Sequence, residues 1–214
     1  MALNTKIGIY LLLAIFLASF TTAASFNSTW DTTKTGVSNA DQVKLPLEID
    51  GTYAFTVDWG DGSSDLITVW NQSEVTHTYA SSGRYNISIN GTIQGFRFAN
   101  TGDKLKILDI SNWGDLNLGN KGRYFDGCSN LDISATDALD LTGTTDLSYM
   151  FANVGQYFVD ADFTSWDTSG VTDMSYVFDS SYFDGNVSTW NTSGVINMEF
   201  MFNWCNFNGD LNSW

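Results

Sequence analysis

The stretch that decides the fold is residues 165–195, SWDTSGVTDMSYVFDSSYFDGNVSTWNTSGV, because it nearly repeats itself. The hexapeptide WDTSGV at 166–171 returns as WNTSGV at 190–195, after 24 residues. A repeat of this length is typical of a solenoid, because one such unit cannot bury its own apolar face and must stack on its neighbours.

The repeat extends back to about residue 105. When the units are aligned on Phe125, Phe151, Phe178 and Phe202, a large apolar residue stands twelve positions earlier in each; these residues are Trp113, Leu139, Trp166 and Trp190, and Trp214 opens a further unit. The first two units are degenerate. We expect a right-handed solenoid over residues 99–214 in which the tryptophan rings of successive coils stack.

Each unit contains two recurring segments. The first is a four-residue strand with an apolar third residue, read as LDIS (108–111), LDIS (131–134), ADFT (161–164), GNVS (185–188) and GDLN (209–212). The second, VTDMSYVF at 171–178 or VINMEFMF at 195–202, has apolar residues at i, i+3 and i+7 and predicts a short helical turn. The frame of the first segment and the tryptophan that follows it resembles that of leucine-rich repeats, with tryptophan where asparagine usually stands. The expected fold is therefore a leucine-rich-repeat-like solenoid of short parallel strands alternating with short helical turns.

The two cysteines fall in one column of this array, three residues after the aligned phenylalanines and three repeats apart. At about 4.8 Å per stacked strand, Cys128 and Cys205 would be about 14 Å apart, too far for a disulfide. We expect both to be small apolar side chains.

The first part of the chain has a different period. From Asp41 to Phe98 apolar residues alternate with polar ones, and Asp61-Gly62 gives a strong hairpin signal. This pattern predicts antiparallel strands with one buried face, in a small β-sandwich over residues 25–98. Asn86 and Asn90 share the outward parity of the last strand.

Two motifs in this part, FTVDWGDGSSD and HTYASSGRYNISI, resemble the polycystic-kidney-disease (PKD) type of immunoglobulin-like domain. The resemblance covers about 60 residues and implies an extracellular spacer or binding module without catalytic activity. His77, the single histidine, lies in the second motif, and we expect it to be packed or hydrogen-bonded at the entry of a strand. Asp58, Asp61 and Asp65 lack the spacing of a calcium loop, and turn chemistry accounts for Asp61.

The repeats resemble the BspA-like surface proteins, which have units of about 25 residues with the pattern W-[DN]-T-S-x-V-x-[DN]-M-x-x-M-F. Residues 190–210 fit this pattern nearly throughout, and residues 166–185 fit it closely. The resemblance implies a secreted or cell-surface adhesion role with undefined ligands. It implies no chemistry.

The amino terminus predicts export. Lys6 precedes an apolar run at 7–20, too short to span a bilayer, and then the small residues TTAAS. We interpret residues 1–24 as a signal peptide and expect a secreted or cell-surface protein without a membrane span. Six sequons suit N-glycosylation in that compartment: Asn27, Asn71, Asn86, Asn90, Asn186 and Asn191.

Charge and composition exclude several functions. The chain carries 9 Lys+Arg against 24 Asp+Glu, a net charge of -15, which excludes nucleic acid as a partner. One histidine and two cysteines in one column provide no nucleophile–base pair and no set of metal ligands, so we expect no enzyme and no metal site.

The leading functional hypothesis is a binding module for an extracellular protein or glycan. In each four-residue strand the second and fourth residues face outward. The second positions are Asp109, Asp132, Asp162, Asn186 and Asp210, and the fourth positions are Ser111, Ser134, Thr164, Ser188 and Asn212. Two interpretations of this acidic and hydroxyl ladder remain open. Its side chains could simply be solvated, or they could engage a cationic partner or a calcium ion bridging to a glycan.

Two alternatives are a structural component of a surface layer or virion surface, and a non-catalytic binding portion of a larger extracellular hydrolase.

The chain stops at the first residue of a new unit. We therefore expect a longer natural protein and some self-association through the uncapped last repeat.

Overall fold

A computed structural model describes residues 24–214, so the expected signal peptide lies outside the described residues except for Ala24. The structure is mainly β, as predicted. Its elements are β1 (Phe26–Asp31), β2 (Gln42–Lys44), β3 (Leu47–Asp58), β4 (Ser64–Ile67), the 3-10 helix η1 (Ser73–Val75), β5 (Thr76–Thr78), β6 (Arg84–Phe96), β7 (Ile107–Asn112), β8 (Leu116–Asn117) and β9 (Asp132–Ile133).

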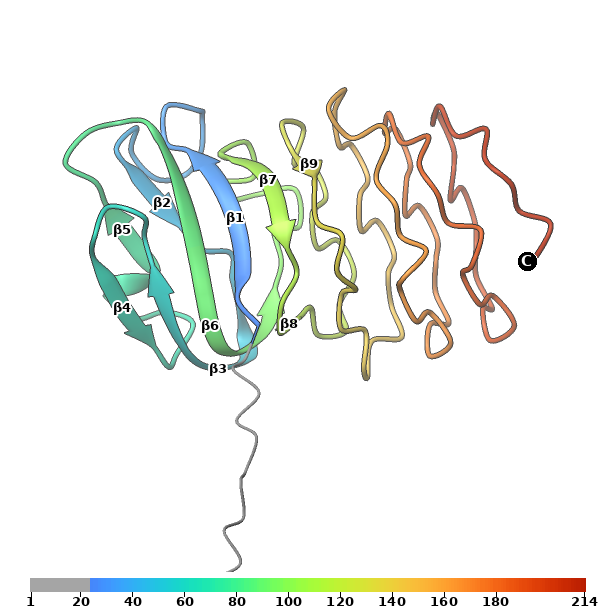
Figure 1. The fold of residues 1–214 in the computed structure, drawn as a ribbon, viewed down its shortest axis with the longest axis horizontal. Coiled ribbons are helices and arrows are strands. Elements are labelled where there is room, and N and C mark those ends of the chain that lie inside the picture. Colours follow the sequence, from blue (N-terminus) through green and yellow to red (C-terminus); the bar gives the residue numbers. More distant parts are fainter. Residues whose placement is uncertain (1–23) are drawn as a thin grey trace, which may run out of the picture.

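One sheet runs through both parts of the molecule. Its strand order is β4-β3-β6-β1-β7-β9, with β8 paired to β6, and β2 and β5 form a separate two-stranded sheet. β1 is antiparallel to β6 on one side and to β7 on the other. The sheet therefore continues past residue 98 into the repeats, and Figure 1 shows the coils stacked beside it. One apolar core extends from Phe26 to Met201.

The strand pattern of the first part is as the sequence predicts. β3 and β4 form a hairpin around Asp61-Gly62, with Asp58 opposite Ser64. The alternating residues Phe55, Val57 and Trp59 are buried because they face the core. Asn86 and Asn90 are exposed on the opposite face of β6.

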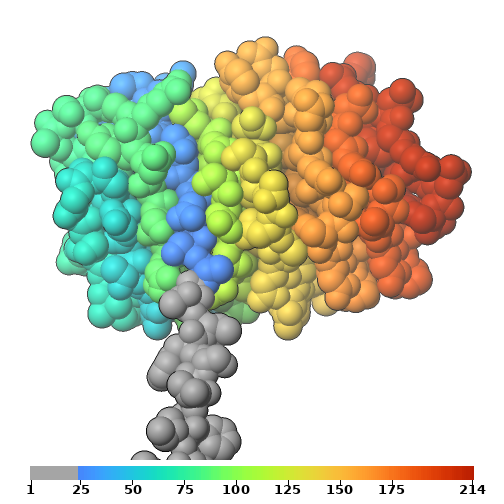
Figure 2. Space-filling model, in the orientation of Figure 1, coloured from blue at the N-terminus to red at the C-terminus, as the bar shows by residue number. Residues whose placement is uncertain are grey.

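The repeat region consists of coils whose backbones pair in parallel. Single parallel bridges join Asp146 to Asp173, Asp173 to Asn197, and Asp162 to Asn186. The coils lie side by side in Figure 1 from β9 to the carboxyl terminus, and Figure 2 shows them as successive bands across the surface.

Aspartate and asparagine make the corners of each coil. A side-chain oxygen accepts a hydrogen bond from the N–H two residues later, which reverses the chain without requiring glycine. The pairs at three corners are Asp140–Thr142, Asp167–Ser169 and Asn191–Ser193; Asp146–Ser148, Asp173–Ser175 and Asn197–Glu199; and Asp162–Thr164, Asn186–Ser188 and Asp210–Asn212. Because Asp and Asn both supply this side-chain oxygen, either residue can occupy these corner positions of the repeat.

The predicted helical turns at 171–178 and 195–202 are wrong. In the first segment the N–H groups bond to the next coil instead of to the preceding turn: Met174 donates to Asn197, Tyr176 to Glu199 and Phe178 to Met201. In the second segment Ile196 and Asn197 donate to Thr172 of the preceding coil. Tyr176 has a φ of 58°, which an α-helix cannot accommodate. The apolar spacing at i, i+3 and i+7 therefore reflects a bent coil that points these side chains into the core.

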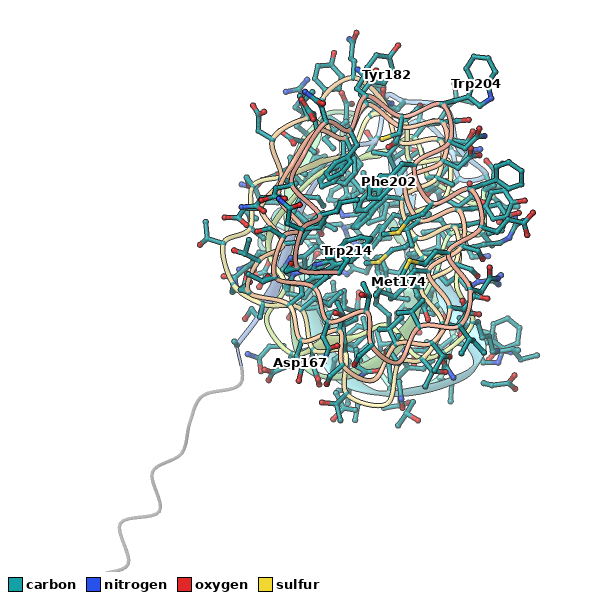
Figure 3. All side chains as sticks on the ribbon, turned by 90° about the vertical axis from the view of Figure 1, so that its right-hand side faces the viewer. Asp167, Met174, Tyr182, Phe202, Trp204 and Trp214 are labelled. Carbon is teal, nitrogen blue, oxygen red and sulfur yellow. The ribbon has the colours of Figure 1, made fainter. Side chains whose placement is uncertain are left out.

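The stacking of the tryptophans is confirmed for the later coils. Trp166 and Trp190 lie 6.1 Å apart with planes at 12°, and Trp190 and Trp214 lie 6.3 Å apart at 2°. Trp113 meets Trp166 edge to face, at 80°, because Leu139 replaces the tryptophan of the intervening unit. Figure 3 shows Trp214 and Phe202 inside the last coil, while Trp204 points outward.

The cysteine column forms as expected. Cys128 is buried, Cys205 is half-buried, and both are free. The thiol of Cys205 lies 3.5 Å from the hydroxyl of Ser181, its counterpart in the preceding coil, and donates to the carbonyl oxygen of Phe183 at 3.2 Å.

Four residues at equivalent positions of successive coils form an outer column, and all four have positive φ. Arg123, Tyr149, Tyr176 and Phe200 have φ of 56–58°. This conformation costs a non-glycine residue about 1–2 kcal/mol. Tyr149 and Tyr176 stack at 4.4 Å, and the guanidinium of Arg123 lies 4.2 Å from the ring of Tyr149, contacts that offset part of this cost.

We predict that Asp173→Ala lowers the free energy of unfolding by about 1–2 kcal/mol, the usual loss when a capping side chain is removed. Asp173→Asn is the matched control, because it keeps the acceptor for Ser175 and Asn197 occupies the same corner in the next coil. Urea unfolding of both variants checks this. An equal loss in the two variants would contradict the corner role.

Candidate functional site

The candidate site lies on the outer face of β7 and β9, where the sequence places the start of the acidic ladder. Asp109 of β7 is in parallel register with Asp132 of β9. The Asp109 carboxylate accepts two hydrogen bonds from Ser134 in the next coil, one from the N–H at 3.1 Å and one from the hydroxyl at 2.8 Å. Three predicted site residues therefore meet here.

The rest of the predicted ladder is arranged differently. Asp162 pairs with Asn186 across a parallel bridge, but no bridge in residues 24–214 joins Asp132 to Asp162. The remaining predicted residues stay in their own coils: the N–H groups of Thr164, Ser188 and Asn212 bond to Asp162, Asn186 and Asp210. Ser111 lies apart, with its hydroxyl 3.5 Å from the carbonyl oxygen of Asn27.

Asp109 and Asp132 line a groove of about 340 Å³, which we call the β7–β9 groove. Its other lining residues are Thr29, Lys34, Arg84, Leu108, Asn130 and Tyr157. The cations come from the first part of the chain, and the pairing of β1 with β6 and β7 brings them here. The sequence did not predict that Lys34 and Arg84 belong to the site, because no local sequence pattern indicates the pairing of β1 with β6 and β7. Tyr157 could have been singled out from the sequence, because it lies in the 27-residue unit between Phe151 and Phe178. This unit is three residues longer than the later units.

The electrostatics of the groove are mixed. Burial raises the pKa of Asp132, and the carboxylates of Asp109 and Asp160 raise it further. Arg84 is exposed and lies 3.6 Å from a carboxylate oxygen of Asp31. Paired carboxylates beside an exposed tyrosine favour a cationic group of a partner, while Lys34 and Arg84 at the other end suit an anionic one.

A second groove of about 350 Å³ adjoins the first and shares Thr29 and Asp109 with it. The sequons of Asn27 and Asn86 lie across from each other on this face, because Asn27 is paired with Ser88 and Thr29 with Asn86. The Thr29 hydroxyl donates to the side-chain oxygen of Asn86 at 3.0 Å. Of the other sequon asparagines, Asn71, Asn90, Asn186 and Asn191 are exposed.

His77 is packed and hydrogen-bonded, as predicted. Its ring stacks on Trp59 at 4.7 Å and its Nε2 lies 2.9 Å from the carboxylate of Asp61. The aspartates nearby serve the turn: Asp58 accepts from the Gly60 N–H and Asp65 from the Trp59 indole. A hydrogen bond from the Ser63 hydroxyl, with a further one from His77, lowers the pKa of Asp61 to about 2.

We predict that Asp61 contributes to the fall of stability in acid. Its pKa is lower in the folded chain than the usual 3.8, so its contribution is present above about pH 4 and is lost as the pH falls toward 2. Melting temperatures measured from pH 5 to pH 2 should therefore fall less steeply in Asp61→Asn than in the wild type. The exposed Asp115→Asn is the control, and an unchanged slope in Asp61→Asn would refute this role.

A buried ion pair joins the two parts of the molecule and was not foreseen. Lys106 and Asp103 are fully buried, with Nζ and Oδ2 3.9 Å apart. The Lys106 ammonium donates to the carbonyl oxygens of Ser38, Asn39 and Gln42 and to the Ser38 hydroxyl, at 2.7–3.2 Å. Burial lowers the pKa of Lys106, and the charge of Asp103 opposes that change. The three carbonyl oxygens can only accept, so they favour the protonated amine, whose three N–H groups they share with the Ser38 hydroxyl.

We predict that Lys106→Met lowers the free energy of unfolding by about 3–5 kcal/mol, because it leaves the Asp103 carboxylate buried without a counter-charge. The exposed Lys34→Met should change it by no more than about 0.5 kcal/mol. Urea unfolding compares the two variants. Equal small losses would show that the buried pair is not an anchor.

Residues 24–214 contain no helix long and apolar enough to cross a bilayer. In the same residues, no three histidine, cysteine, aspartate or glutamate side chains are grouped closely enough to hold a metal ion.

Comparison with known proteins covers only the later coils. The family described as "Mycoplasma protein of unknown function, DUF285" matches residues 145–214. No curated protein and no solved structure matches the chain. The matched residues are the regularly stacked coils in which Asp146, Asp173 and Asn197 form one corner column. The coils from residue 145 onward are therefore similar to a repeat family to which no function is assigned.

Proposed function

We propose that this chain is a non-catalytic binding module that presents the outer face of its sheet to an extracellular protein or glycan. The observation that carries the proposal is the β7–β9 groove, where Asp109 and Asp132 lie in parallel register and line the same partly open pocket. Their like charges are close together, and Asp132 is half-buried, so a cationic group of a partner would relieve both the repulsion and the cost of burial.

The finer fold assignment supports the same role. We infer that the first part is a PKD-like immunoglobulin domain, on its W-G-D-G-S hairpin and the stacking of His77 on Trp59. We infer that the coils form a leucine-rich-repeat-like solenoid of the BspA type, on their parallel bridges and tryptophan stack. Both classes suit a secreted or cell-surface protein. The segment at residues 1–24 and the exposed sequons are consistent with that location.

The groove can be tested with Asp109→Asn/Asp132→Asn. Asparagine keeps one oxygen acceptor, so the bond from Ser134 to residue 109 can persist while both charges are lost. We expect the double variant to bind a protein carrying a basic surface, such as hen lysozyme, at least tenfold more weakly than the wild type in surface plasmon resonance at low salt. The wild-type affinity should fall as salt is added.

The matched control is Asp115→Asn/Asp167→Asn, which removes two charges from exposed positions outside the groove. It should leave binding within about twofold. Equal weakening in both double variants would mean that only the net charge matters, and unchanged binding in the groove variant would place the site elsewhere.

A structural role in a surface layer or virion surface is the second candidate. It is favoured by Ile196 and Trp204, which are exposed on the last coil at positions where the preceding coil has Thr172 and Ser180. Sedimentation velocity of the same samples separates the two roles, because a surface component would form ordered oligomers in the absence of any partner. The third candidate is the non-catalytic binding portion of a larger hydrolase, and the same variants of the β7–β9 groove test it.

A further inference from the structure

A third groove lies away from the ladder, where the two-stranded sheet meets the segment that leads into the repeats. It has a volume of about 660 Å³, within the range of sites for small ligands. Its floor is apolar and includes Leu45, Val75 and Phe98, all buried. At its rim the indole of Trp70 is 38% exposed. We call this the Trp70 groove.

The charge of the Trp70 groove is opposite to that of the protein. The chain has a net charge of -15, yet the residues lining this groove include Lys44 and Arg97 and no aspartate or glutamate. Glu48 lies 3.6 Å from Arg97 and compensates part of its charge. The ammonium of Lys44 has no carboxylate within ion-pair distance among residues 24–214. An anionic group therefore finds a free positive charge here.

The loop that carries Trp70 is held in place before any ligand binds. The side-chain oxygen of Gln72 accepts from the N–H groups of Thr68 and Val69, at 2.8 and 3.2 Å. Its amide donates to the carbonyl oxygen of Leu66 at 2.8 Å and to Glu74 at 3.2 Å. Little conformational entropy remains to be lost when a ligand packs on the indole.

The main chain along the floor is already paired. The N–H of Leu45 donates to Val75, and that of Arg97 donates to the carbonyl oxygen of Pro46. An extended peptide therefore finds few free backbone partners to pair with as an added strand. What the groove offers is side chains: one indole face, two cations, and the amide and hydroxyl groups of Asn71 and Thr76.

We propose that the Trp70 groove binds an acidic saccharide, with a sugar ring packed on the indole of Trp70 and its carboxylate at Lys44. Arg97 lies close enough to the same groove to add a second positive charge. The amide and hydroxyl groups of the lining match the hydroxyl groups of a sugar. This site is separate from the β7–β9 groove and does not depend on the proposed binding there.

The experiment uses residues 25–214 produced without glycosylation, because Asn71 in the groove belongs to a sequon. Isothermal titration calorimetry compares a hyaluronan tetrasaccharide, which carries glucuronate, with neutral chitotetraose. We expect the acidic saccharide to bind at least fivefold more tightly, and added salt to reduce the difference. Trp70→Ala should weaken binding about tenfold and Lys44→Gln about fivefold.

Trp204→Ala is the matched control for an exposed tryptophan, and Lys121→Gln for an exposed lysine outside both grooves; both should leave the affinity within twofold. Circular dichroism and melting temperatures confirm that each variant is folded. The proposal is overturned if neither saccharide binds, if the neutral one binds as tightly as the acidic one, or if Trp70→Ala leaves the affinity unchanged. Equal binding of a hexaglutamate peptide would overturn it as well, because the groove would then recognise negative charge and not the saccharide.

Discussion

The pairing of β1 between β6 and β7 is the constraint on which the rest of this structure depends. β1 closes the sheet of the first part on one side and supplies, on the other, the edge against which the coils begin to stack. Without it the two parts would share only the short β6–β8 pairing within the sheet. With it, Lys34 and Arg84 lie in the same groove as Asp109 and Asp132.

The buried Lys106–Asp103 pair reinforces that junction from the other side. Two of the three carbonyl oxygens that surround the ammonium belong to the loop between β1 and β2, and the third to Gln42 at the start of β2, while both charged residues precede β7. A hydrophobic pair could fill the same space at lower desolvation cost. The ionic arrangement instead fixes the direction in which the loop approaches the first coil.

Much of the fold could be predicted because the repeated residues show how the units align with one another. The alignment on Phe178 and Phe202 places the tryptophans, the cysteines and the outward residues of each strand correctly. The helical turns could not be predicted correctly, because the spacing of Val171, Met174 and Phe178 fits a helix as well as a coil that turns with positive φ at Tyr176. What decides between them is the coil-to-coil hydrogen bonding, which is not a local property.

The candidate site shows the same limit. Parity alone predicts that Asp109 and Asp132 face outward, but not that Thr29, Lys34 and Arg84, which lie 25 to 103 positions earlier, join them, because β1 pairs across long stretches of sequence. The Trp70 groove had no motif at all. Only the fold reveals that Lys44 and Arg97 lie around Trp70.

The central place of β1 also has a mechanical consequence. β1 begins two residues after Ala24 and is bonded on both edges, so a pull along its axis from the amino-terminal side loads both ladders at once in shear. Hydrogen bonds loaded together resist more force than bonds peeled one by one from a sheet edge. A protein held by its sheet face and pulled from its amino-terminal side would therefore bear tension through both ladders of β1, and the stacked coils would carry little of the load.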